Sequence, residues 1–199
     1  NTPFSEVHSV DHPISIYAAT KRANELFAHT YSHLYNLPCT GMRLFTVYGP
    51  WGRPDMAPMV FAKSIYSKNP IKIFNFGKMS RSFTYIDDVI DSIQKLIKKP
   101  AKFDKKFDKC NPNPSTSWCP HRIFNIGNSK SIELEEFISL LENEIGIKAI
   151  KHYEDIQAGD VEKTLSNSNL LSDWIGECPE TPLSVGIEQF VSWFKNYYK

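Results

Sequence analysis

The amino-acid sequence predicts an α/β fold with a largely parallel sheet. Segments with strand-like patterns alternate with amphipathic helical segments along most of the chain. Its 199 residues can bury a substantial core, and a composition of 41% hydrophobic and 23% charged residues is ordinary for a globular protein. No internal repeat is visible in the sequence. We therefore expect one domain, or one large domain with part of another.

The first predicted helix follows an extended loop. Pro3 and Pro13 block regular structure in residues 1–14, and Ser15 can cap a helix that runs to about Tyr35. Asn36 and Pro38 then end it. Apolar and small residues at steps of three and four predict its buried face, which comprises Ile16, Ala19, Ala23, Leu26, Phe27, Thr30 and Leu34.

The middle of the chain predicts two further strand–helix units. A strand over residues 39–45 opens into a rigid loop of Gly, Pro and aromatic residues, followed by a helix over 58–68. Short strands are expected over 71–74 and 82–86, separated by a polar, basic loop. Asp87 or Asp88 opens a helix that Pro100 stops. Its predicted inner face is Val89, Ile90, Ile93, Leu96 and Ile97.

The second half begins with a long surface loop over residues 101–121, rich in Lys, Asn and Pro. We expect a strand over 123–126, a helix capped by Ser131 and closed by Gly146, and a strand over 148–153. A polar loop over 155–163 and a short helix over 168–175 follow. Thr181 is predicted to cap the final helix, with Pro182 in its first turn.

Charge and cysteine content limit the classes of partner. The net charge is +1, and no apolar run approaches the ~20 residues of a membrane span, so neither a nucleic-acid nor a membrane partner is expected. The four cysteines form no Cys-x-x-Cys pair, which favours reduced thiols and a cytoplasmic protein. Cys110 and Cys119 could pair or bind metal, but unpaired loop thiols are expected. His29 and His33 have metal-ligand spacing without the glutamate of a zinc helix, so no metal site is expected.

The chain begins without a signal peptide and without an initiator Met, which suggests part of a longer protein. Its most informative feature is the pair Tyr17 and Lys21, four residues apart and hence on one helix face. A phenol is a poor base at neutral pH, but a neighbouring ammonium lowers its pKa and suits it to accept a proton from a sugar or alcohol hydroxyl. A surface tyrosine and lysine without function would have the same spacing, so other motifs must decide.

Further motifs follow this pair in a fixed order. They are Glu25, the segment RLFTVYGPWGRPDM at 43–56, RSFTYIDDV at 81–89, FNIGN at 124–128 and GDV at 159–161. The set resembles the NAD-dependent nucleotide-sugar epimerase/dehydratases, which are extended short-chain dehydrogenase/reductases. Within them, the Tyr-Gly-Pro-Trp-Gly-Arg-Pro-Asp-Met loop is most similar to the UDP-glucuronate 4-epimerases. The resemblance extends from residue 3 to about residue 197.

This resemblance implies the C-terminal part of a Rossmann-like enzyme with a small mixed α/β substrate-binding subdomain. Residues 1–56 would end the dinucleotide-binding domain, and residues 57–199 would mainly bind the nucleotide sugar, with some segments returning to the main sheet. The Gly-rich half of the family's fold and its Ser/Thr cluster for the sugar hydroxyl are missing. Most of the NAD site would therefore lie outside this chain.

The resemblance also implies a catalytic pair and a cofactor. Tyr17 would be the acid/base at the sugar 4-hydroxyl, and Lys21 would lower the Tyr17 pKa and hydrogen-bond the nicotinamide ribose. Phe45 would border the nicotinamide of NAD through its backbone. Thr46 would contact the substrate near the sugar, although a hydroxyl bonded to turn backbone is the plainer alternative.

Four more residues are implied in binding a UDP-sugar. Arg53 would bind the substrate carboxylate with its two-pronged guanidinium, unless it is simply an exposed loop arginine. Arg81 would hold the diphosphate and Asp160 would lie near the nucleotide ribose. Phe74 would border the uracil, with a plain core position equally expected. Gln157 stands where some relatives place a second diphosphate arginine.

The function implied is NAD-dependent epimerisation at C4 of a UDP-sugar, UDP-glucuronate to UDP-galacturonate, through a transient 4-keto sugar. A 4,6-dehydratase or decarboxylase on the same scaffold is the main alternative. A catalytically incomplete module for sugar-nucleotide binding or dimerisation is another. Relatives dimerise through the Tyr-x-x-x-Lys helix, so a homodimer is expected, and polysaccharide biosynthesis is the family's implied pathway.

Overall fold

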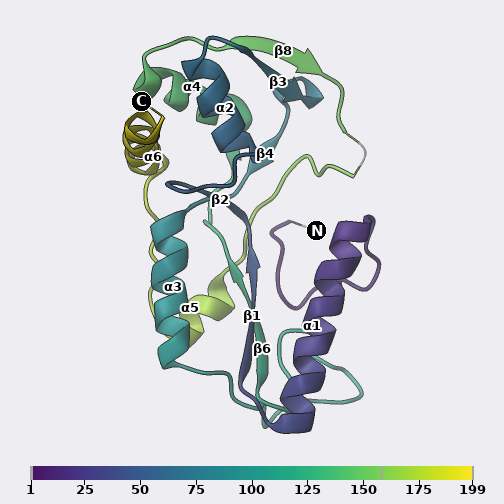
Figure 1. Ribbon diagram of the computed structural model, residues 1–199. Helices are drawn as coiled ribbons and strands as arrows, with labels where there is room; N and C mark the ends of the chain where they lie inside the picture. Colours follow the sequence, from purple (N-terminus) through teal and green to yellow (C-terminus); the bar gives the residue numbers. More distant parts are fainter. Residues whose placement is uncertain (1, 158, 199) are drawn as a thin grey trace.

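The structure is a computed structural model that describes residues 2–157 and 159–198. Figure 1 shows two lobes joined around the ends of the central strands. In one lobe, strands β1 (Cys39–Leu44) and β6 (His121–Ile126) have helix α1 (Ile16–Tyr35) on one side and helices α3 (Ile86–Lys98) and α5 (Asn169–Ile175) on the other. The N-terminal segment lies between α1 and β1 (Figure 1).

The other lobe contains helices α2 (Ala57–Tyr66), α4 (Leu134–Ile145) and α6 (Leu183–Tyr197) beside strands β3 (Pro70–Phe74) and β8 (Ile150–Glu154) (Figure 1). The remaining elements are short: β2 (Thr46–Tyr48), a 3-10 turn η1 (Asn75–Gly77), β4 (Ser80–Arg81), β5 (Phe83–Tyr85) and β7 (Ile132–Glu133). The order of helices and strands agrees closely with the sequence prediction.

The strand pairings confirm a largely parallel arrangement. β1 pairs with β6, β2 with β5, and β3 with β8, all in parallel, whereas β4 pairs with β7 antiparallel. Two hydrophobic cores result. The larger surrounds Phe137, Phe190 and Phe194 between α2, α4 and α6, and the smaller packs Val89 and Leu96 of α3 against Phe124 and Ile126 of β6 and Leu171 of α5.

The predicted buried face of α1 is wrong for its large apolar residues, although Ala19 and Ala23 turn inward as predicted. Four of its apolar residues are largely exposed, at 83% for Ile16, 53% for Leu26, 65% for Phe27 and 62% for Leu34. The helix instead turns small and polar residues toward the body of the protein: Ala18, Ala19, Arg22, Ala23, Glu25, Ala28, His29 and Ser32. The reason is that α1 binds Arg43 of β1 through an ion pair and the loop before β6 through hydrogen bonds to Ser117 and Trp118, so its apolar stripe faces away.

Several local predictions are also corrected. On α3, Ile90 and Ile97 are exposed, although Val89 and Leu96 are buried as predicted. Ser131 does not cap α4, because β7 intervenes and the Ser131 hydroxyl donates to the Thr164 carbonyl. Thr181 does not cap α6 either. Its N–H and hydroxyl bind the buried carboxylate of Asp88, which ties the start of α6 to α3.

Candidate functional site

A large cavity opens at the C-terminal end of β1. Its volume is about 640 Å³, and it is lined by the end of β1, the start of β2 and the N-terminal segment, including Phe4, His8, Arg43, Phe45, Thr46, Asn125 and Thr164. Ligands of open α/β sheets bind at the carboxyl ends of strands. The structure therefore places the predicted residues Phe45 and Thr46 where a ligand is expected.

Phe45 lies between β1 and β2 in the chain and is fixed by contacts with β6 and with Phe4. Its N–H donates to the Ile126 carbonyl at 3.1 Å, and its ring packs near that of Phe4. Gly127 allows this approach, because a Cβ there would lie 2.8 Å from the Phe45 ring and 2.6 Å from the Ser166 Cβ. Cβ atoms do not approach non-bonded carbon atoms this closely, so a glycine is required behind Phe45, which lines the cavity.

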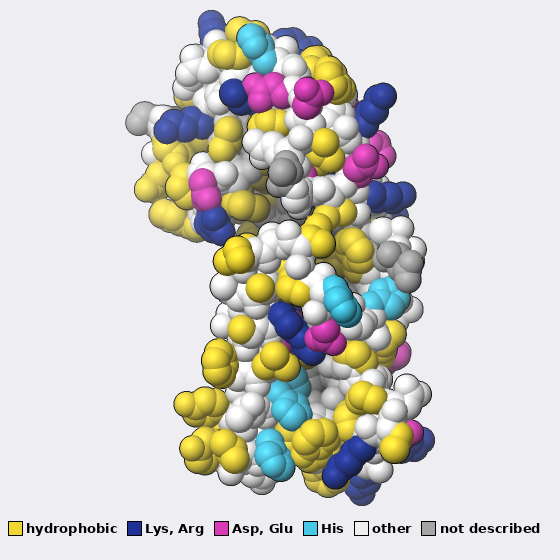
Figure 2. Space-filling model, turned by 90° about the vertical axis from the view of Figure 1, so that its right-hand side faces the viewer, with side chains coloured by type: hydrophobic (Ala, Val, Ile, Leu, Met, Phe, Trp, Pro, Cys, Tyr) yellow, Lys and Arg dark blue, Asp and Glu magenta, His cyan; other side chains and the backbone are white. Residues whose placement is uncertain are grey.

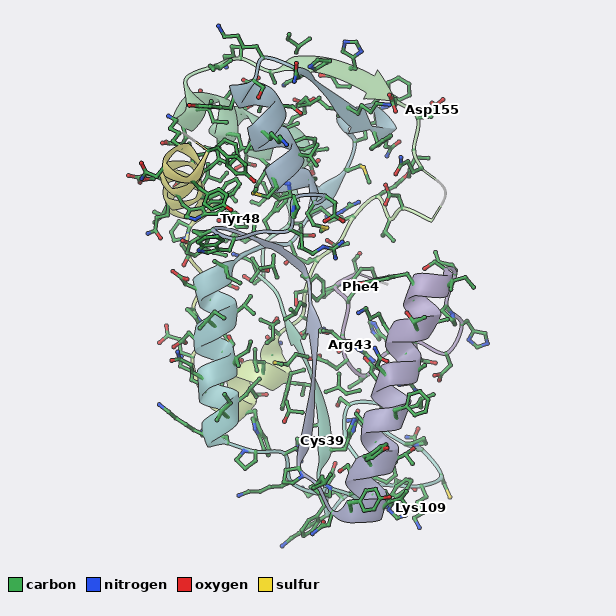
Figure 3. All side chains as sticks on the ribbon, in the orientation of Figure 1. Phe4, Cys39, Arg43, Tyr48, Lys109 and Asp155 are labelled. Carbon is green, nitrogen blue, oxygen red and sulfur yellow. The ribbon has the colours of Figure 1, made fainter. Side chains whose placement is uncertain are left out.

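The N-terminal segment forms part of this cavity, which sequence reasoning missed. Phe4 pairs with residues 165–167 through backbone hydrogen bonds, and its carbonyl accepts from the Asn125 side chain at 2.9 Å. The fully buried Glu6 accepts from the Asn125 N–H at 2.8 Å. Because these contacts join residues more than a hundred positions apart, no local pattern could have signalled them. Phe4 and Arg43 both lie between α1 and β1 (Figure 3).

A second cavity, of about 540 Å³, lies between α1 and β1. Tyr17, Lys21 and Glu25 of α1 line one side, and Arg43 of β1 lines the other. Lys21 Nζ lies over the Tyr17 ring, 5.2 Å from its centroid, and Tyr17 is 67% exposed. The two cavities share Arg43 and Leu44 in their linings. Tyr17 and Lys21 therefore line a cavity that borders on the one at the end of β1.

Arg53 projects from the loop after β2. Its guanidinium binds Asp55, with Nη2 2.6 Å from Oδ2 and Nε 3.1 Å from Oδ1. These hydrogen bonds and the negative charge of Asp55 raise the pKa of Arg53. Asp55 in turn has a pKa below its ordinary value because of the hydrogen bonds from Arg53. Arg53 is not part of the lining of either cavity.

The loop that carries Arg53 is anchored to α6 by aromatic rings. Trp51 has a left-handed backbone conformation, with φ of 62°, which is unusual for a residue with a large side chain. Its ring lies 5.4 Å from that of Trp193 and 5.1 Å from that of Tyr197. These contacts hold the loop against the C-terminal helix, two residues before Arg53.

Arg81 and Asp160 lie near one another at the antiparallel β4–β7 pair. Arg81 Nη1 donates to the carbonyls of Ser80 and Glu162, each at 3.0 Å. Burial lowers the pKa of Arg81, whereas the charge of Asp160 raises it. The segment that follows Asp160 runs beside β4 and reaches Thr164 in the first cavity. Phe74 ends β3, half-buried, outside the linings of both cavities.

The two helix histidines serve the packing of α1. His29 Nε2 lies 2.8 Å from the Ser117 hydroxyl, and His33 Nδ1 accepts from the Trp118 indole at 3.1 Å. Residues 2–157 and 159–198 contain no group of three or more His, Cys, Asp or Glu side chains arranged to hold a metal ion. Within the same residues, no helix is both long and apolar enough to cross a membrane. All four cysteines are unpaired.

Comparison with known proteins gives consistent matches. Residues 1–127 match the model of the NAD dependent epimerase/dehydratase family. Protein CapI of Staphylococcus aureus is 50% identical over 197 residues, which cover 99% of this chain and 59% of that protein. A Rhizobium meliloti protein named as a probable UDP-glucuronate 4-epimerase is 40% identical, over 99% of this chain and 58% of its own length.

A solved structure of the same kind of enzyme has a similar fold. UDP-glucuronic acid 4-epimerase from Bacillus cereus, in complex with UDP-glucuronic acid and NAD, superposes with a TM-score of 0.80 at 30% identity. The match covers 98% of this chain and 58% of that one. The chain thus spans somewhat over half the length of the relatives that it matches.

Proposed function

The chain belongs to the NAD-dependent epimerase/dehydratase family, and we propose that it provides the proton-transfer and sugar-nucleotide side of a UDP-glucuronate 4-epimerase. Its fold is part of the Rossmann-like fold of the extended short-chain dehydrogenase/reductases, as the sequence predicted. The observation that carries the proposal is that Tyr17 and Lys21 line one cavity together with the end of β1, with the Lys21 ammonium over the Tyr17 ring.

The cavity beside α1 suits part of an NAD molecule. Tyr17 and Lys21 present a hydroxyl and an ammonium toward the same 540 Å³ space, and both can hydrogen-bond ribose hydroxyls. Phe45 at the end of β1 would border the nicotinamide. The sequence has no Gly-x-Gly-x-x-Gly turn for the pyrophosphate. Residues of this chain would therefore hold only the nicotinamide end.

The proposed reaction inverts C4 of the sugar. A bound NAD would supply the acceptor for the C4 hydride and the donor that gives it back. Tyr17, as phenolate, takes the proton of the 4-hydroxyl, which leaves a 4-keto sugar. After the sugar has rotated to present its other face, Tyr17 returns the proton to the 4-oxygen. Lys21 stabilises the phenolate through its positive charge, and 2–4 orders of magnitude in rate are typical of such general acid–base catalysis.

Recognition of the substrate carboxylate is assigned to Arg53. A guanidinium binds a carboxylate through two parallel hydrogen bonds, which is how it binds Asp55 here. Thr46 would orient the sugar at the mouth of the first cavity. Arg81 and Asp160 would hold the diphosphate and the ribose, and Phe74 would border the uracil.

We also propose the division of the chain that the family implies. Residues 1–56 form the cofactor side, and residues 57–199 mainly form the substrate side. The two hydrophobic cores support this division only partly, because α3, β6 and α5 lie in the second range but pack in the lobe of β1. These are the segments that return to the main sheet.

A homodimer through α1 is part of the proposal. The exposed apolar residues of this helix include Leu26, Phe27, Tyr31, Leu34 and Tyr35. Figure 2 views the molecule from the α1 side and shows hydrophobic side chains gathered over its lower part. Sedimentation equilibrium tests this point. A monomer that stays monomeric over a hundredfold range of concentration would contradict it.

The activity test requires the part of the fold that this chain does not contain. We define the completed enzyme as this chain joined to the portion of Staphylococcus aureus CapI outside the matched region. With NAD and UDP-glucuronate, the expected product by NMR is UDP-galacturonate. A 4-keto-6-deoxy sugar formed from UDP-glucose or a dTDP-sugar would favour a dehydratase, and release of carbon dioxide would favour a decarboxylase.

The remaining alternative is a module that only binds sugar nucleotides. Calorimetry on the 199-residue chain with UDP and with NAD, each alone, separates it from the enzyme. Measurable UDP binding, together with a completed enzyme that turns over no nucleotide sugar, would favour the binding module. Turnover of UDP-glucuronate by the completed enzyme would exclude it.

A further inference from the structure

Glu25 of α1 and Arg43 of β1 form a bidentate ion pair. Arg43 Nε donates to Glu25 Oε1 at 2.7 Å, and Arg43 Nη2 donates to Glu25 Oε2 at 2.9 Å. Arg22 adds a third bond, from Nη1 to Glu25 Oε2 at 3.0 Å, and its Nε binds Asp11. The side chains of Glu25 and Arg43 are only 17% and 21% exposed.

This ion pair is the main contact between the sheet and the first half of α1, residues 16–25, which contains Tyr17 and Lys21. Apart from capping bonds to Ser15, every described hydrogen bond from residues 16–25 to a residue outside α1 involves Arg22 or Glu25. Apolar packing adds little, because Ile16 is 83% and Tyr17 is 67% exposed, and the inward-facing apolar side chains of this segment are alanines that are only half-buried. The orientation of this half of the helix therefore depends on polar contacts.

The pair also connects the two groups of proposed site residues. Tyr17, Lys21 and Glu25 follow one another at steps of four, so they lie along one side of α1. Arg43 lies two residues before Phe45 and three before Thr46, at the end of β1. Glu25 and Arg43 themselves line the cavity that contains Tyr17 and Lys21. A change at the pair would thus shift the phenol relative to the end of the strand.

Glu25 is ionised in this setting. Burial raises the pKa of its carboxyl, but the hydrogen bonds and positive charges of Arg43 and Arg22 outweigh burial, and the pKa lies below its ordinary value. A guanidinium and a carboxylate joined by two bonds also fix direction, since both groups are planar. An amide at position 25 would keep the size of the side chain but lose the charge and one acceptor.

We propose that Glu25 and Arg43 are positioning residues, which hold the Tyr17–Lys21 side of α1 in register with the end of β1 and so support turnover and not substrate binding. This rests on the proposed acid/base role of Tyr17. A displacement of about 1 Å at a reacting group can cost ~100-fold in rate. Loss of the pair should therefore lower kcat strongly and leave KM nearly unchanged.

Two measurements test the proposal on Glu25→Gln. In the completed enzyme we expect kcat for UDP-glucuronate to fall about 10- to 100-fold, with KM changed less than about twofold, and Glu25→Asp to recover part of the loss because it keeps the charge. In the 199-residue chain, amide hydrogen exchange over residues 16–28 should accelerate at least about 10-fold, since local opening follows the contacts that hold a segment.

Glu142→Gln is the matched control. Glu142 is another ionised, largely buried glutamate, which binds Lys148 Nζ at 2.7 Å and the Ala149 N–H at 3.0 Å in the lobe away from α1. This variant should lower global stability, accelerate exchange in α4 and leave kcat unchanged. If Glu25→Gln behaves in the same way, with kcat retained, its role is only structural and the proposal is wrong.

The two measurements also separate this inference from the proposed function. A completed enzyme without UDP-glucuronate turnover would overturn the function, and hydrogen exchange would still decide whether the pair holds α1. Unchanged exchange over residues 16–28 in Glu25→Gln would overturn the positioning role whatever the reaction is.

Discussion

The guanidinium of Arg53 is bound by the carboxylate of Asp55, two residues along the same loop, through both Nη2 and Nε. The arginine proposed to bind the substrate carboxylate is thus already bound to a carboxylate of the protein. Both side chains are exposed, at 69% and 64%, so the pair is accessible and a substrate can displace Asp55. The exchange replaces one carboxylate by another on the same two donors.

Asp55→Asn should therefore strengthen binding of an acidic sugar. Exposed ion pairs contribute only about 0.2–1 kcal/mol, so we expect KM for UDP-glucuronate to fall up to about fivefold. Arg53→Gln is the opposing variant and should raise this KM about 10- to 100-fold, as for a lost charge-assisted hydrogen bond. Steady-state kinetics on the completed enzyme check both. If each variant changed the affinity for UDP alone as much as it changes the KM for UDP-glucuronate, Arg53 would not contact the sugar carboxylate.

Tyr17→Phe removes the proposed acid/base and nothing else. We expect kcat to fall about 10²- to 10⁴-fold with little change in KM. The unfolding midpoint should not change, because Tyr17 is largely exposed and its hydroxyl makes no described hydrogen bond within residues 2–157 and 159–198. Tyr31→Phe on the same helix is the control and should retain full activity. A near-normal rate in Tyr17→Phe would exclude the base role.

Gly127→Ala should destabilise the wall of the first cavity. The new Cβ would have to displace the Phe45 ring and Ser166, at 2.8 and 2.6 Å, and overpacking of this kind costs about 1–3 kcal/mol. Urea unfolding measures the loss of free energy. Gly146→Ala is the comparison, because a Cβ there meets no atom within 4 Å and only its left-handed φ of 83° is strained, at about 1–2 kcal/mol.

The comparison also tests the link from this wall to the site. In the completed enzyme, Gly127→Ala should reduce activity beyond its effect on stability, because Phe45 borders the proposed nicotinamide position. Gly146→Ala should leave activity unchanged. Equal activity in the two variants, at a temperature where both are folded, would argue against a functional role for the position of Phe45.

The buried imidazole of His121 should lower the stability of the protein in mild acid. Burial lowers the pKa of its imidazole to about 4, with a smaller contribution from the like charge of His29. The unfolded chain takes up this proton near the ordinary pKa of about 6.5. The free energy of unfolding therefore has its full value above about pH 6.5, where the imidazole is neutral in both states. The contribution declines as the pH falls from about 6.5 to about 4, by up to about 3 kcal/mol.

Urea unfolding at pH 7 and at pH 5 measures this dependence. Between the two pH values, the free energy of unfolding should change less in His121→Gln than in the parent chain. His152→Gln is the control, because His152 is exposed, and it should keep the parent's pH dependence. An unchanged pH dependence in His121→Gln would show that His121 is not the titrating group.

Much of the fold could be predicted from the sequence because its signals are local. Hydrophobic periodicity, proline and glycine placement and the N-cap Ser15 locate the helices and strands within a few residues. The ordered motifs from Tyr17 to Asp160 identified the family without any three-dimensional information. The same local reasoning was wrong at Ser131 and Thr181, where distant partners, Thr164 and Asp88, take the hydroxyls that would otherwise cap a helix.

The sequence by itself determined the helices and the longer strands, the family and the spacing of Tyr17 and Lys21, since all of these depend on neighbours along the chain. It did not show the short strands β2 and β7, which form only against distant partners. Only the tertiary structure decided which face of α1 turns inward. An amphipathic pattern cannot show that Glu25 of this helix packs against an oppositely charged residue, Arg43, on a distant strand. The tertiary structure also decided that Phe4 and Glu6 help to build the cavity, and that Arg53 is bound to Asp55. Each of these depends on distances between atoms that the order of residues does not contain.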